Sequence, residues 1–240
     1  MTLPDVLSHQ VLPRHVESEW LDVLAADDPR ARRSRGDLRR LNALMWHAGL
    51  MARRLKARPA PPRTLLDLGS GDGSLMLAVA RRLAPRWRGV TIRLLDQQSL
   101  VTAATLSGFA ALGWRAEPVA ADLIEYLDRD EAAADAITAN LVLHHFEPAE
   151  LSLLLRRVAR RTPHFVACET RRARHALILC RMLWAIGCND VTRHDAPASV
   201  RAGFRGAELS ALWPDRGHWR LREGAAGLFS HCLEARRHDL

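Results

Sequence analysis

The chain has 240 residues, 48% of them hydrophobic, which suits a single α/β core with a short attached segment. Its net charge of +8 raises the question of nucleic-acid binding. No stretch approaches the roughly 20 apolar residues that span a bilayer, and the start of the chain lacks the basic and apolar regions of a signal peptide. Four cysteines at irregular spacing, without a C-x-x-C pair, predict reduced thiols in a cytoplasmic protein rather than a zinc site or disulfides.

The segment before Arg63 is predicted to be a separate helical unit. Residues 12–24 are expected to form a short helix and residues 25–33 a polar connector. Ser34 and Asp37 have the S-x-x-D form of a capping box, which predicts the start of a second helix there. An apolar stripe at helical spacing follows and predicts one continuous helix, with Leu41, Leu44, Met45, Ala48, Met51 and Leu55 on its buried face.

The most informative stretch is a short apolar strand at residues 64–68 that leads directly into a glycine-rich turn and a helix. Gly69, Gly71 and Gly73 alternate with other residues, so the backbone can take positive φ and lie close to a ligand. The helix N-terminus behind the turn presents free N–H groups to a carboxylate or phosphate. A dinucleotide-binding G-x-G-x-x-G turn would need its third glycine where Ser74 stands, so the spacing argues against that class.

Three more apolar strands are predicted downstream, at residues 90–95, 118–121 and 135–142. The first ends in Asp96, where doubly wound sheets place the carboxylate that accepts hydrogen bonds from ribose hydroxyls. The second ends in Asp122, and both aspartates could also be plain helix N-caps. The last strand ends just before His144 and His145, which precede a helix over residues 149–161.

The C-terminal third is expected to complete the sheet. The predicted elements are a fifth strand at residues 164–169, a helix at residues 171–186 and a hairpin of strands at residues 219–223 and 228–235. Between the helix and the hairpin, residues 187–195 form a run of polar side chains that predicts a loop. Such a loop would either contact substrate at the cleft mouth or be a solvated loop whose charged side chains only cap and pair.

The D-x-G-x-G-x-G turn, the acidic strand ends and the V-L-H-H-F sequence at residues 142–146 together resemble class I S-adenosylmethionine-dependent methyltransferases, in particular their small-molecule branch. The resemblance covers residues 63–240 and implies a doubly wound, seven-stranded, mostly parallel Rossmann-like sheet with a reversed last strand pair. Residues 1–58 would then be an N-terminal helical cap over the cofactor cleft. The resemblance implies S-adenosyl-L-methionine as cofactor and assigns its binding to Asp67, Gly69, Ser70, Gly71, Gly73, Asp96, Gln97, Asp122, Leu123 and Asn140.

Methyl transfer from a sulfonium needs no metal, so none is expected, but a hydroxyl nucleophile must lose its proton. Histidine has the pKa best placed for that task. The candidate bases are His144 and His145 beside the expected methyl group, and His194 in the later loop. The residues predicted to contact substrate are Asn42, Trp46 and His47 in the cap, and Asn189 and Arg193 in the loop.

The expected activity is transfer of a methyl group to a small hydroxylated acceptor, aromatic or lipophilic and of phenol, resorcinol or quinol type as in secondary metabolism, with O- and C-methylation both open. A nucleic-acid methyltransferase and a cofactor-binding partner subunit without turnover are the alternatives. Nucleic acid is disfavoured because the arginines lie in scattered short pairs with little aromatic interleaving. Residues 140–143 also lack the Asn/Asp-Pro-Pro-aromatic tetrad of enzymes that methylate base amines. Whether the chain forms a homodimer is left open.

Overall fold

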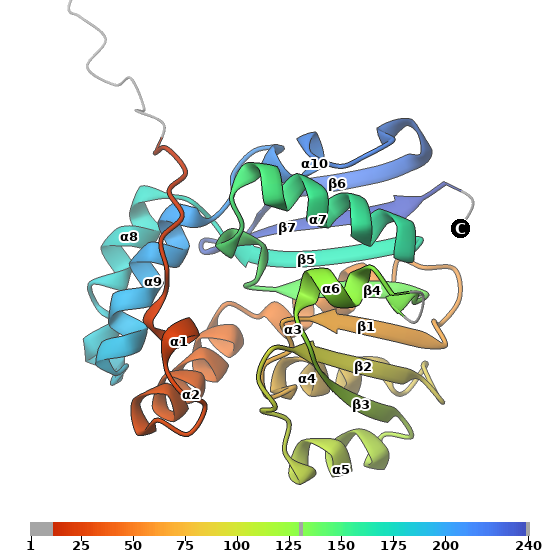
Figure 1. Cartoon of the computed structure of the whole chain (residues 1–240), viewed down its shortest axis with the longest axis horizontal. Helices are drawn as coiled ribbons and strands as arrows, with labels where there is room; N and C mark the ends of the chain where they lie inside the picture. Colours follow the sequence, from red (N-terminus) through yellow and green to blue (C-terminus); the bar gives the residue numbers. More distant parts are fainter. Residues whose placement is uncertain (1–11, 130–131, 239–240) are drawn as a thin grey trace, which may run out of the picture.

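A computed structural model describes residues 12–129 and 132–238 of the chain. Its centre is a seven-stranded sheet with strand order β3-β2-β1-β4-β5-β7-β6 (Figure 1). The strands are β1 (Thr64–Leu68), β2 (Thr91–Asp96), β3 (Arg115–Ala120), β4 (Ala136–Asn140), β5 (His164–Thr170), β6 (Trp219–Ala226) and β7 (Ser230–Arg237). Strands β1 to β5 pair in parallel, and β7 is antiparallel to both β5 and β6. The predicted mostly parallel sheet with a reversed last strand is therefore confirmed.

Helices cover both faces of the sheet. One face packs against α3 (His47–Leu55), α4 (Ser74–Leu83) and α5 (Ala103–Ala111), and the other against α6 (Leu123–Leu127), α7 (Pro148–Arg161) and α10 (Glu208–Ala211). Strand β1 carries leucines that face both sides of the sheet. Leu65 belongs to the core on the α3 and α4 face, whereas Leu66 and Leu68 belong to the core on the opposite face. A strand that is buried on both faces has no solvent side on which to place polar residues.

A helical cap stands at the carboxyl ends of the strands, at the left of Figure 1. It consists of α1 (Trp20–Val23), α2 (Pro29–Leu44), α8 (Arg174–Cys180), the 3-10 helix η3 (Leu183–Ile186) and α9 (Asp190–Ala202). Two further 3-10 turns are η2 (Leu143–His145) and η4 (Arg216–His218). The cap therefore combines the start of the chain with a segment that follows β5, whereas the sequence predicted a cap from the N-terminal segment alone.

Buried carboxylates join the two parts of the cap. Asp37 on α2 accepts hydrogen bonds from the backbone N–H of Asn189 at 2.8 Å and from the Thr192 hydroxyl at 3.0 Å. Asp195 on α9 accepts from the backbone N–H groups of Trp20 and Leu21 at 2.9 and 3.0 Å. Each carboxylate satisfies donors at the start of a helix in the other part, so these bonds hold the two parts together.

The start of the cap differs from its prediction. Only Trp20–Val23 is helical within the expected helix at residues 12–24. Its earlier part is held by tertiary bonds, because Arg14 donates to the carbonyls of Ala202 and Phe146 at 2.8 and 2.9 Å. Helix α2 begins at Pro29, inside the expected connector, since Asp28 caps it and proline suits the first helical position.

The presumed capping box at Ser34 is wrong, because Ser34 and Asp37 are both buried within α2 and bind α9. The expected continuous helix is also broken at Trp46, which takes a left-handed conformation with φ 57°. Its ring lies over Gly49, where a Cβ would come within 2.3 Å of the indole.

The predicted polar loop at residues 187–195 is largely the first turns of α9, because Asn189 caps that helix by accepting from the Thr192 N–H at 3.0 Å. The expected helix at residues 171–186 is divided into α8 and η3.

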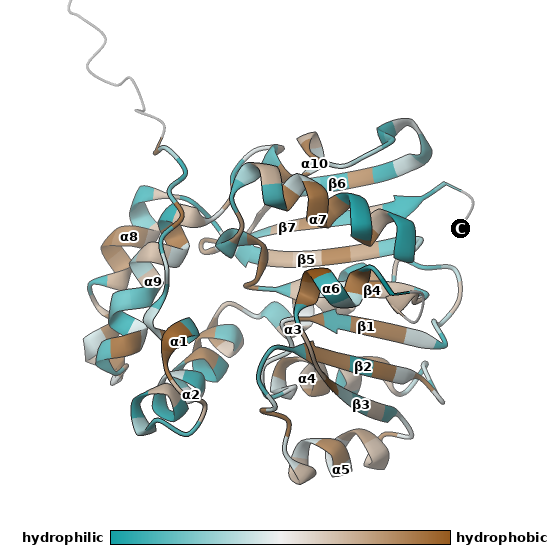
Figure 2. Ribbon diagram, viewed as in Figure 1, coloured by the Kyte–Doolittle hydropathy of each residue, from teal (hydrophilic) through white to brown (hydrophobic). Residues whose placement is uncertain are grey.

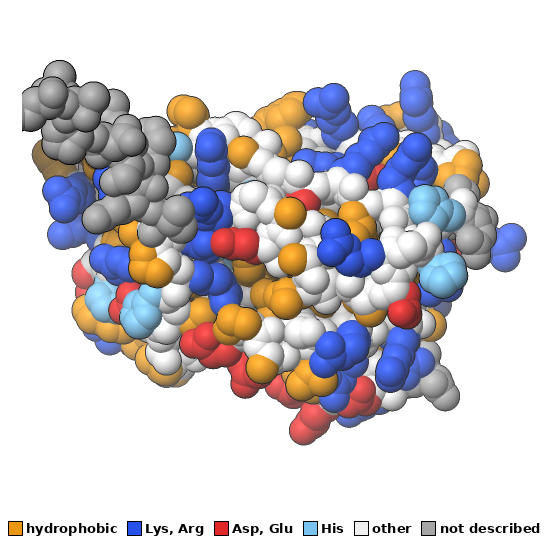
Figure 3. Space-filling model, turned by 90° about the horizontal axis from the view of Figure 1, so that it is seen from above, with side chains coloured by type: hydrophobic (Ala, Val, Ile, Leu, Met, Phe, Trp, Pro, Cys, Tyr) orange, Lys and Arg blue, Asp and Glu red, His pale blue; other side chains and the backbone are white. Residues whose placement is uncertain are grey.

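Hydrophobic residues follow the strands and the inner sides of the helices in Figure 2, as expected for a sheet that is covered on both faces. On the face drawn in Figure 3, lysine and arginine side chains are spread in small groups and do not form one continuous stripe. Within residues 12–129 and 132–238, no helix combines the length and apolar character that crossing a membrane requires.

Candidate functional site

A cleft of about 480 Å³ lies between the carboxyl ends of β1, β2 and β4 and the helical cap. The glycine turn after β1 and the residues after β2 line one end of it. The other end is lined by His144 and His145 after β4, by Glu19 and Asp22 near α1, and by Ser199 on α9. The topology thus brings the predicted glycine turn and the predicted histidine pair into a single cavity.

The glycine turn adopts the conformation that its sequence predicts. Gly69, Gly71 and Gly73 have φ of 64°, 55° and 73°, in the left-handed region that favours glycine. A Cβ on Gly69 would lie 2.2 Å from the Val142 side chain, so glycine is needed there for packing. A Cβ on Gly71 would meet no atom within 4 Å, and Gly71 lines the cleft. The backbone at Gly71 therefore leaves room for a ligand to approach.

Asp96, at the end of β2, fixes this turn and faces the cleft. Its carboxylate accepts hydrogen bonds from the backbone N–H of Gly71 at 2.8 Å and from that of Gln98 at 2.9 Å. Each carboxylate oxygen can accept a further hydrogen bond, so Asp96 could also bind ligand hydroxyls. The neighbouring Gln97 lines the same end of the cleft.

Polar groups that are buried in the cleft wall are further candidates to contact a ligand. Asp67 is 3% exposed and accepts from the Thr138 hydroxyl at 2.6 Å. Burial raises the pKa of the Asp67 carboxyl to about 7, although the Thr138 hydrogen bond opposes this change. Within the described part of the chain, Ser70 Oγ and Asn140 Oδ1 are buried without a hydrogen-bond partner. Since buried polar atoms are normally paired, these two atoms are candidates to bind a ligand.

The predicted adenine contacts are only partly on the cleft. Leu123 lines it, but Asp122 is exposed and is not among the lining residues. The Asp122 carboxylate caps α6 by accepting from the backbone N–H groups of Ile124 and Glu125 at 2.8 and 3.0 Å. The N-cap interpretation is therefore the one that these contacts support, and cofactor binding by Asp122 stays a prediction.

Helix α2 covers the glycine turn from the cap side. Arg39 forms an ion pair with Asp72 of the turn at 2.6 Å. Asn42 lines the cleft, and its Oδ1 accepts from the side-chain amide of Asn140 at 3.2 Å. Of the three predicted substrate residues in the cap, Asn42 is the one that lies in the cleft.

His144 is the most strongly constrained side chain of the cleft. Its Nδ1 donates to Glu169 on β5 at 2.7 Å, and its Nε2 donates to Glu19 at 3.3 Å. Burial alone would lower the pKa of this imidazole, but the hydrogen bonds to Glu169 and Glu19 outweigh burial and raise it to about 10. At neutral pH, His144 is therefore positively charged.

Glu169 is fully buried and anchors the whole turn after β4. One carboxylate oxygen accepts from the backbone N–H groups of Val142 and Leu143 at 2.9 and 2.8 Å, while the other accepts from His144. Burial would raise the pKa of Glu169, yet these bonds lower it below its ordinary value. Glu19 also has a lowered pKa, because its bonds to His144 and Ser199 exceed the effect of burial.

His145 is less buried and lies beside His144, with 4.2 Å between their ring centroids. Its Nδ1 is 3.2 Å from a carboxylate oxygen of Asp22, and its side chain is 30% exposed. Glu19, His144 and His145 each offer one possible metal-ligand atom, and these three atoms lie within 4.8 Å of one another. Carboxylate oxygens and imidazole nitrogens are common ligands of divalent metal ions. Both nitrogens of His144 are already bonded to carboxylates. The expectation that no metal takes part stays a prediction.

The remaining predicted site residues lie outside the cleft lining. His194 is on α9, stacked on Trp20 with 3.8 Å between ring centroids, and its Nδ1 bonds Asp195 at 2.9 Å. His47 is fully buried and bonds Ser230 on β7 at 2.8 Å. Trp46 is 55% exposed and lines a different pocket.

Two predicted substrate residues belong to α9. Asn189 is its N-cap and donates through its amide to the Arg30 carbonyl at 2.8 Å. Arg193 is exposed on the same helix and does not line the cleft. Substrate contact by either residue stays a prediction.

Sequence reasoning missed the three carboxylates around the histidines, namely Glu19, Asp22 and Glu169. A signal was present for Glu169, because a glutamate at the end of a strand that is otherwise suited to burial needs a partner. No comparable signal marked Glu19 and Asp22, which reach the cleft only through the fold of the cap.

The chain is similar to known methyltransferases in sequence and in fold. Residues 65–163 match the family model of a methyltransferase domain. The fold is similar to the plantazolicin methyltransferase BpumL in complex with SAH, with TM-score 0.61 and 13% identity over 88% of this chain and 92% of that one. The magnesium protoporphyrin IX methyltransferase ChlM from Synechocystis PCC 6803 with bound SAH gives TM-score 0.55 and 14% identity over 90% and 91% of the two chains. The mitomycin 7-O-methyltransferase MmcR gives TM-score 0.59 and 25% identity over 88% of this chain and 58% of that one. No curated protein matches the chain.

Proposed function

We propose that the chain, whose residues 65–163 match the family model of a methyltransferase domain, transfers a methyl group from S-adenosylmethionine to a small hydroxylated acceptor that binds at the histidine end of the cleft. The observation that carries this proposal is the presence of His144 and His145 in the same cavity as the glycine turn. A histidine is useful there when the acceptor must lose a proton, which applies to a hydroxyl group.

The glycine end of the cleft fits the cofactor. The open space at Gly71 and the unpaired Ser70 Oγ and Asn140 Oδ1 would receive its polar parts, and Asp96 would accept from the ribose hydroxyls. When bound, S-adenosylmethionine supplies an electrophilic methyl group on a positively charged sulfonium. Asp67, with its pKa of about 7, would become more fully ionised beside a positive charge.

We assign different roles to the two histidines. His144 already holds a proton at neutral pH and cannot accept another, and both of its N–H groups are donated to carboxylates, so we give it a positioning role: it ties Glu19 to the turn after β4 beside His145. His145 lines the cleft with its Nδ1 beside Asp22, and it would take the proton of the hydroxyl group. Glu169 acts through His144, whose ring it holds in place and keeps protonated.

The walls around the histidines favour an acceptor with an apolar body. Leu21, Leu38 and Phe146 line the cleft together with the polar groups. A phenol, resorcinol or quinol combines a flat apolar ring with one ionisable hydroxyl, and its anion can be methylated on oxygen or carbon. This acceptor class is also in keeping with neighbours named as O-methyltransferases.

The test is transfer of a labelled methyl group to a panel of phenols, resorcinols and quinols by the full chain. With one accepted substrate, His145→Ala should lower turnover by about 10² to 10⁴ fold while cofactor affinity is unchanged. His194→Ala is the matched control, because His194 lies outside the cleft.

Slow turnover in His194→Ala alone would move the base to α9, and slow turnover in His144→Ala alone would move it to His144. If none of the three variants is slow, the general-base assignment fails. Methylation of RNA but of no phenol would favour a nucleic-acid substrate instead, and cofactor binding without any turnover would favour a partner subunit.

A further inference from the structure

A group of large apolar side chains is exposed on the outer surface of the cap. The segment of α8 and η3 carries most of them, and its ribbon is largely brown in Figure 2. The exposed fractions are 61% for Ile178, 56% for Met182, 66% for Trp184 and 46% for Ile186. Single exposed apolar residues are common on proteins, but a contiguous group usually marks an interaction surface.

The same segment is strongly basic. Residues 171–188 contain four arginines and one histidine, with no aspartate or glutamate. One of the arginines, Arg172, is buried in an ion pair with Glu208. Another, Arg181, is exposed between Ile178 and Trp184. Arginine beside Trp and aliphatic side chains is the composition of helices that lie in a membrane interface.

The apolar surface continues onto neighbouring elements. His175 on α8 bonds the carbonyl of Leu228 in the β6–β7 turn at 2.7 Å, and Leu228 is 62% exposed. At the other end, Arg40 on α2 bonds the carbonyl of Ile186 at 3.0 Å. One turn further along α2, Leu44, which was expected on the buried face of its helix, is instead 71% exposed. We call these exposed residues of α8, η3, the β6–β7 turn and the end of α2 the apolar cap surface.

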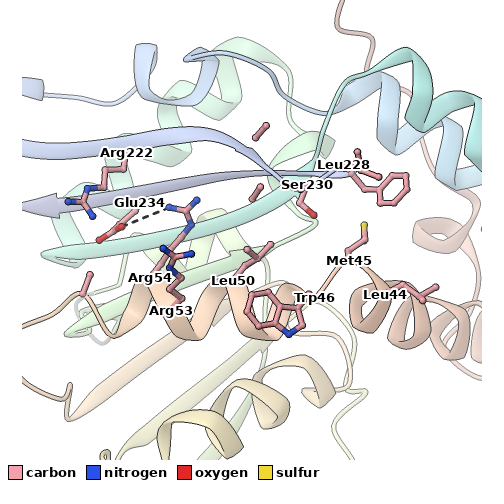
Figure 4. Close-up of a pocket in the computed structure, with 15 residues that line it drawn as sticks. Leu44, Met45, Trp46, Leu50, Arg53, Arg54, Arg222, Leu228, Ser230 and Glu234 are labelled. Atoms are coloured by element: carbon pink, nitrogen blue, oxygen red, sulfur yellow. Dashed lines mark ion pairs between the residues drawn. The ribbon is translucent and has the colours of Figure 1, made fainter.

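A basic groove of about 680 Å³ opens beside this surface (Figure 4). Leu44 and Leu228 lie at the right of the view, and Arg53, Arg54 and Arg222 lie at the left, with Trp46 between the two groups. Arg54 is 4.0 Å from Glu234, the one acidic residue of the groove lining. In the described part of the chain, Arg53 and Arg222 make no ion pair within 4 Å.

The positive charge of this face favours an anionic bilayer over a second copy of the chain as its partner. A two-fold pairing of identical copies would place this acid-free arginine segment against itself, so like charges would meet. The surface of an anionic bilayer instead offers phosphates for the arginines and an apolar layer for the side chains of α8 and η3.

We propose that the apolar cap surface and the basic groove form a docking face for an anionic lipid bilayer. Trp184, Ile186 and Ile178 would enter the boundary between headgroups and acyl chains, and Arg53 and Arg222 would contact lipid phosphates. This face lies outside the cofactor cleft, so the proposal does not depend on the identity of the methyl acceptor.

The test is sedimentation of the full chain with phosphatidylcholine vesicles that either contain or lack phosphatidylglycerol. Binding is expected only with phosphatidylglycerol and should weaken as salt is raised, because salt screens the arginines. Trp184→Ser should reduce partitioning at least about tenfold. Leu153→Ser is the control, since Leu153 is 47% exposed on α7, away from this face, and should leave binding unchanged.

The charge variants test the groove. Arg53→Gln and Arg222→Gln should each lower partitioning about fivefold, whereas Arg88→Gln, an exposed arginine outside both regions, should have little effect. Glycerol phosphate in solution should bind weakly and should not displace the chain from vesicles.

Three results would overturn the proposal. They are absence of binding to anionic vesicles at low salt, equal losses in Trp184→Ser and Leu153→Ser, and displacement by glycerol phosphate. A change from dimer to monomer in Trp184→Ser without any vesicle binding would identify a second copy of the chain as the partner.

Discussion

Replacing Glu169 by Gln tests the charged core of the proposed active site. Glutamine has nearly the same shape as glutamate and can still accept from the N–H groups of Val142 and Leu143 through its oxygen. It cannot supply the negative charge, and its amide N–H₂ would face the Nδ1 proton of His144. His144 would then lose its proton more readily, so its pKa should fall.

The magnitude follows from the pKa of His144. A rise from 6.5 to about 10, at ~1.4 kcal/mol for each pKa unit, corresponds to about 5 kcal/mol of stabilisation. Glu19 shares this stabilisation, and the introduced glutamine keeps two backbone bonds, so we expect Glu169→Gln to lower the free energy of unfolding by about 2–4 kcal/mol at neutral pH. Since the pKa of His144 is raised in the folded state, this stabilisation is complete below pH 6.5 and is lost as pH rises through about 10. The effect of the substitution should therefore shrink toward alkaline pH.

The measurement is denaturant unfolding of both proteins at acidic, neutral and alkaline pH, with NMR of the His144 ring to follow its titration. Glu117→Gln is the control, because Glu117 forms an exposed ion pair with Arg115 and should change stability by less than about 1 kcal/mol. The reasoning would be refuted by a Glu169→Gln effect as small as that of the control, or by one equally large on both sides of the His144 pKa. Titration of His144 near 6.5 in the unmodified chain would refute it as well.

Three further predictions concern the cofactor end and the cap. Asp96→Ala should weaken S-adenosylmethionine binding by roughly 1–3 kcal/mol in calorimetry, through loss of charge-assisted hydrogen bonds, and unchanged affinity would exclude Asp96 from the site. Gly71→Val should abolish binding, because its side chain would enter the cleft, whereas Gly113→Val, with similar positive φ and open space outside the cleft, should cost stability but keep affinity. Asp37→Asn should lower the free energy of unfolding by about 1–3 kcal/mol, since a buried junction of α2 and α9 loses its charge, and thermal unfolding without any change would contradict that role.

The sheet was predictable because its signals are local. Strands β1, β2, β4 and β5 are short, largely apolar runs, whereas β3 carries Arg115 and Glu117 and is less buried. The glycine spacing after residue 68 specifies a turn with positive φ. Parallel order then brings the ends of β1, β2 and β4 to one edge, so Gly71, Asp96 and His144 line one cleft as expected.

The cap was less predictable because its helices depend on contacts between distant segments. Helix α1 is a single turn that starts on a carboxylate from residue 195, and the polar run after residue 187 becomes helical where it meets α2. Ser34 illustrates the difficulty. Its spacing to Asp37 fits an N-terminus, but both side chains instead face Thr192 across a helix interface. Local spacing cannot distinguish these two uses of the same residues.

At the histidine end of the cleft, a charged side chain that is buried identifies a candidate site residue better than the residue type alone does. Four histidines, His47, His144, His164 and His231, are almost completely buried, so burial of a histidine alone does not select one. His47 and His164 have pKa values lowered chiefly by burial and remain neutral at pH 7, as is usual for buried histidines. Of these four, His144 is the one that lines the cleft. Its pKa is strongly raised because it lies between two carboxylates. Keeping a charged group there costs desolvation energy that an apolar replacement would avoid, and charged groups held in a cleft at such a cost are frequent at functional sites.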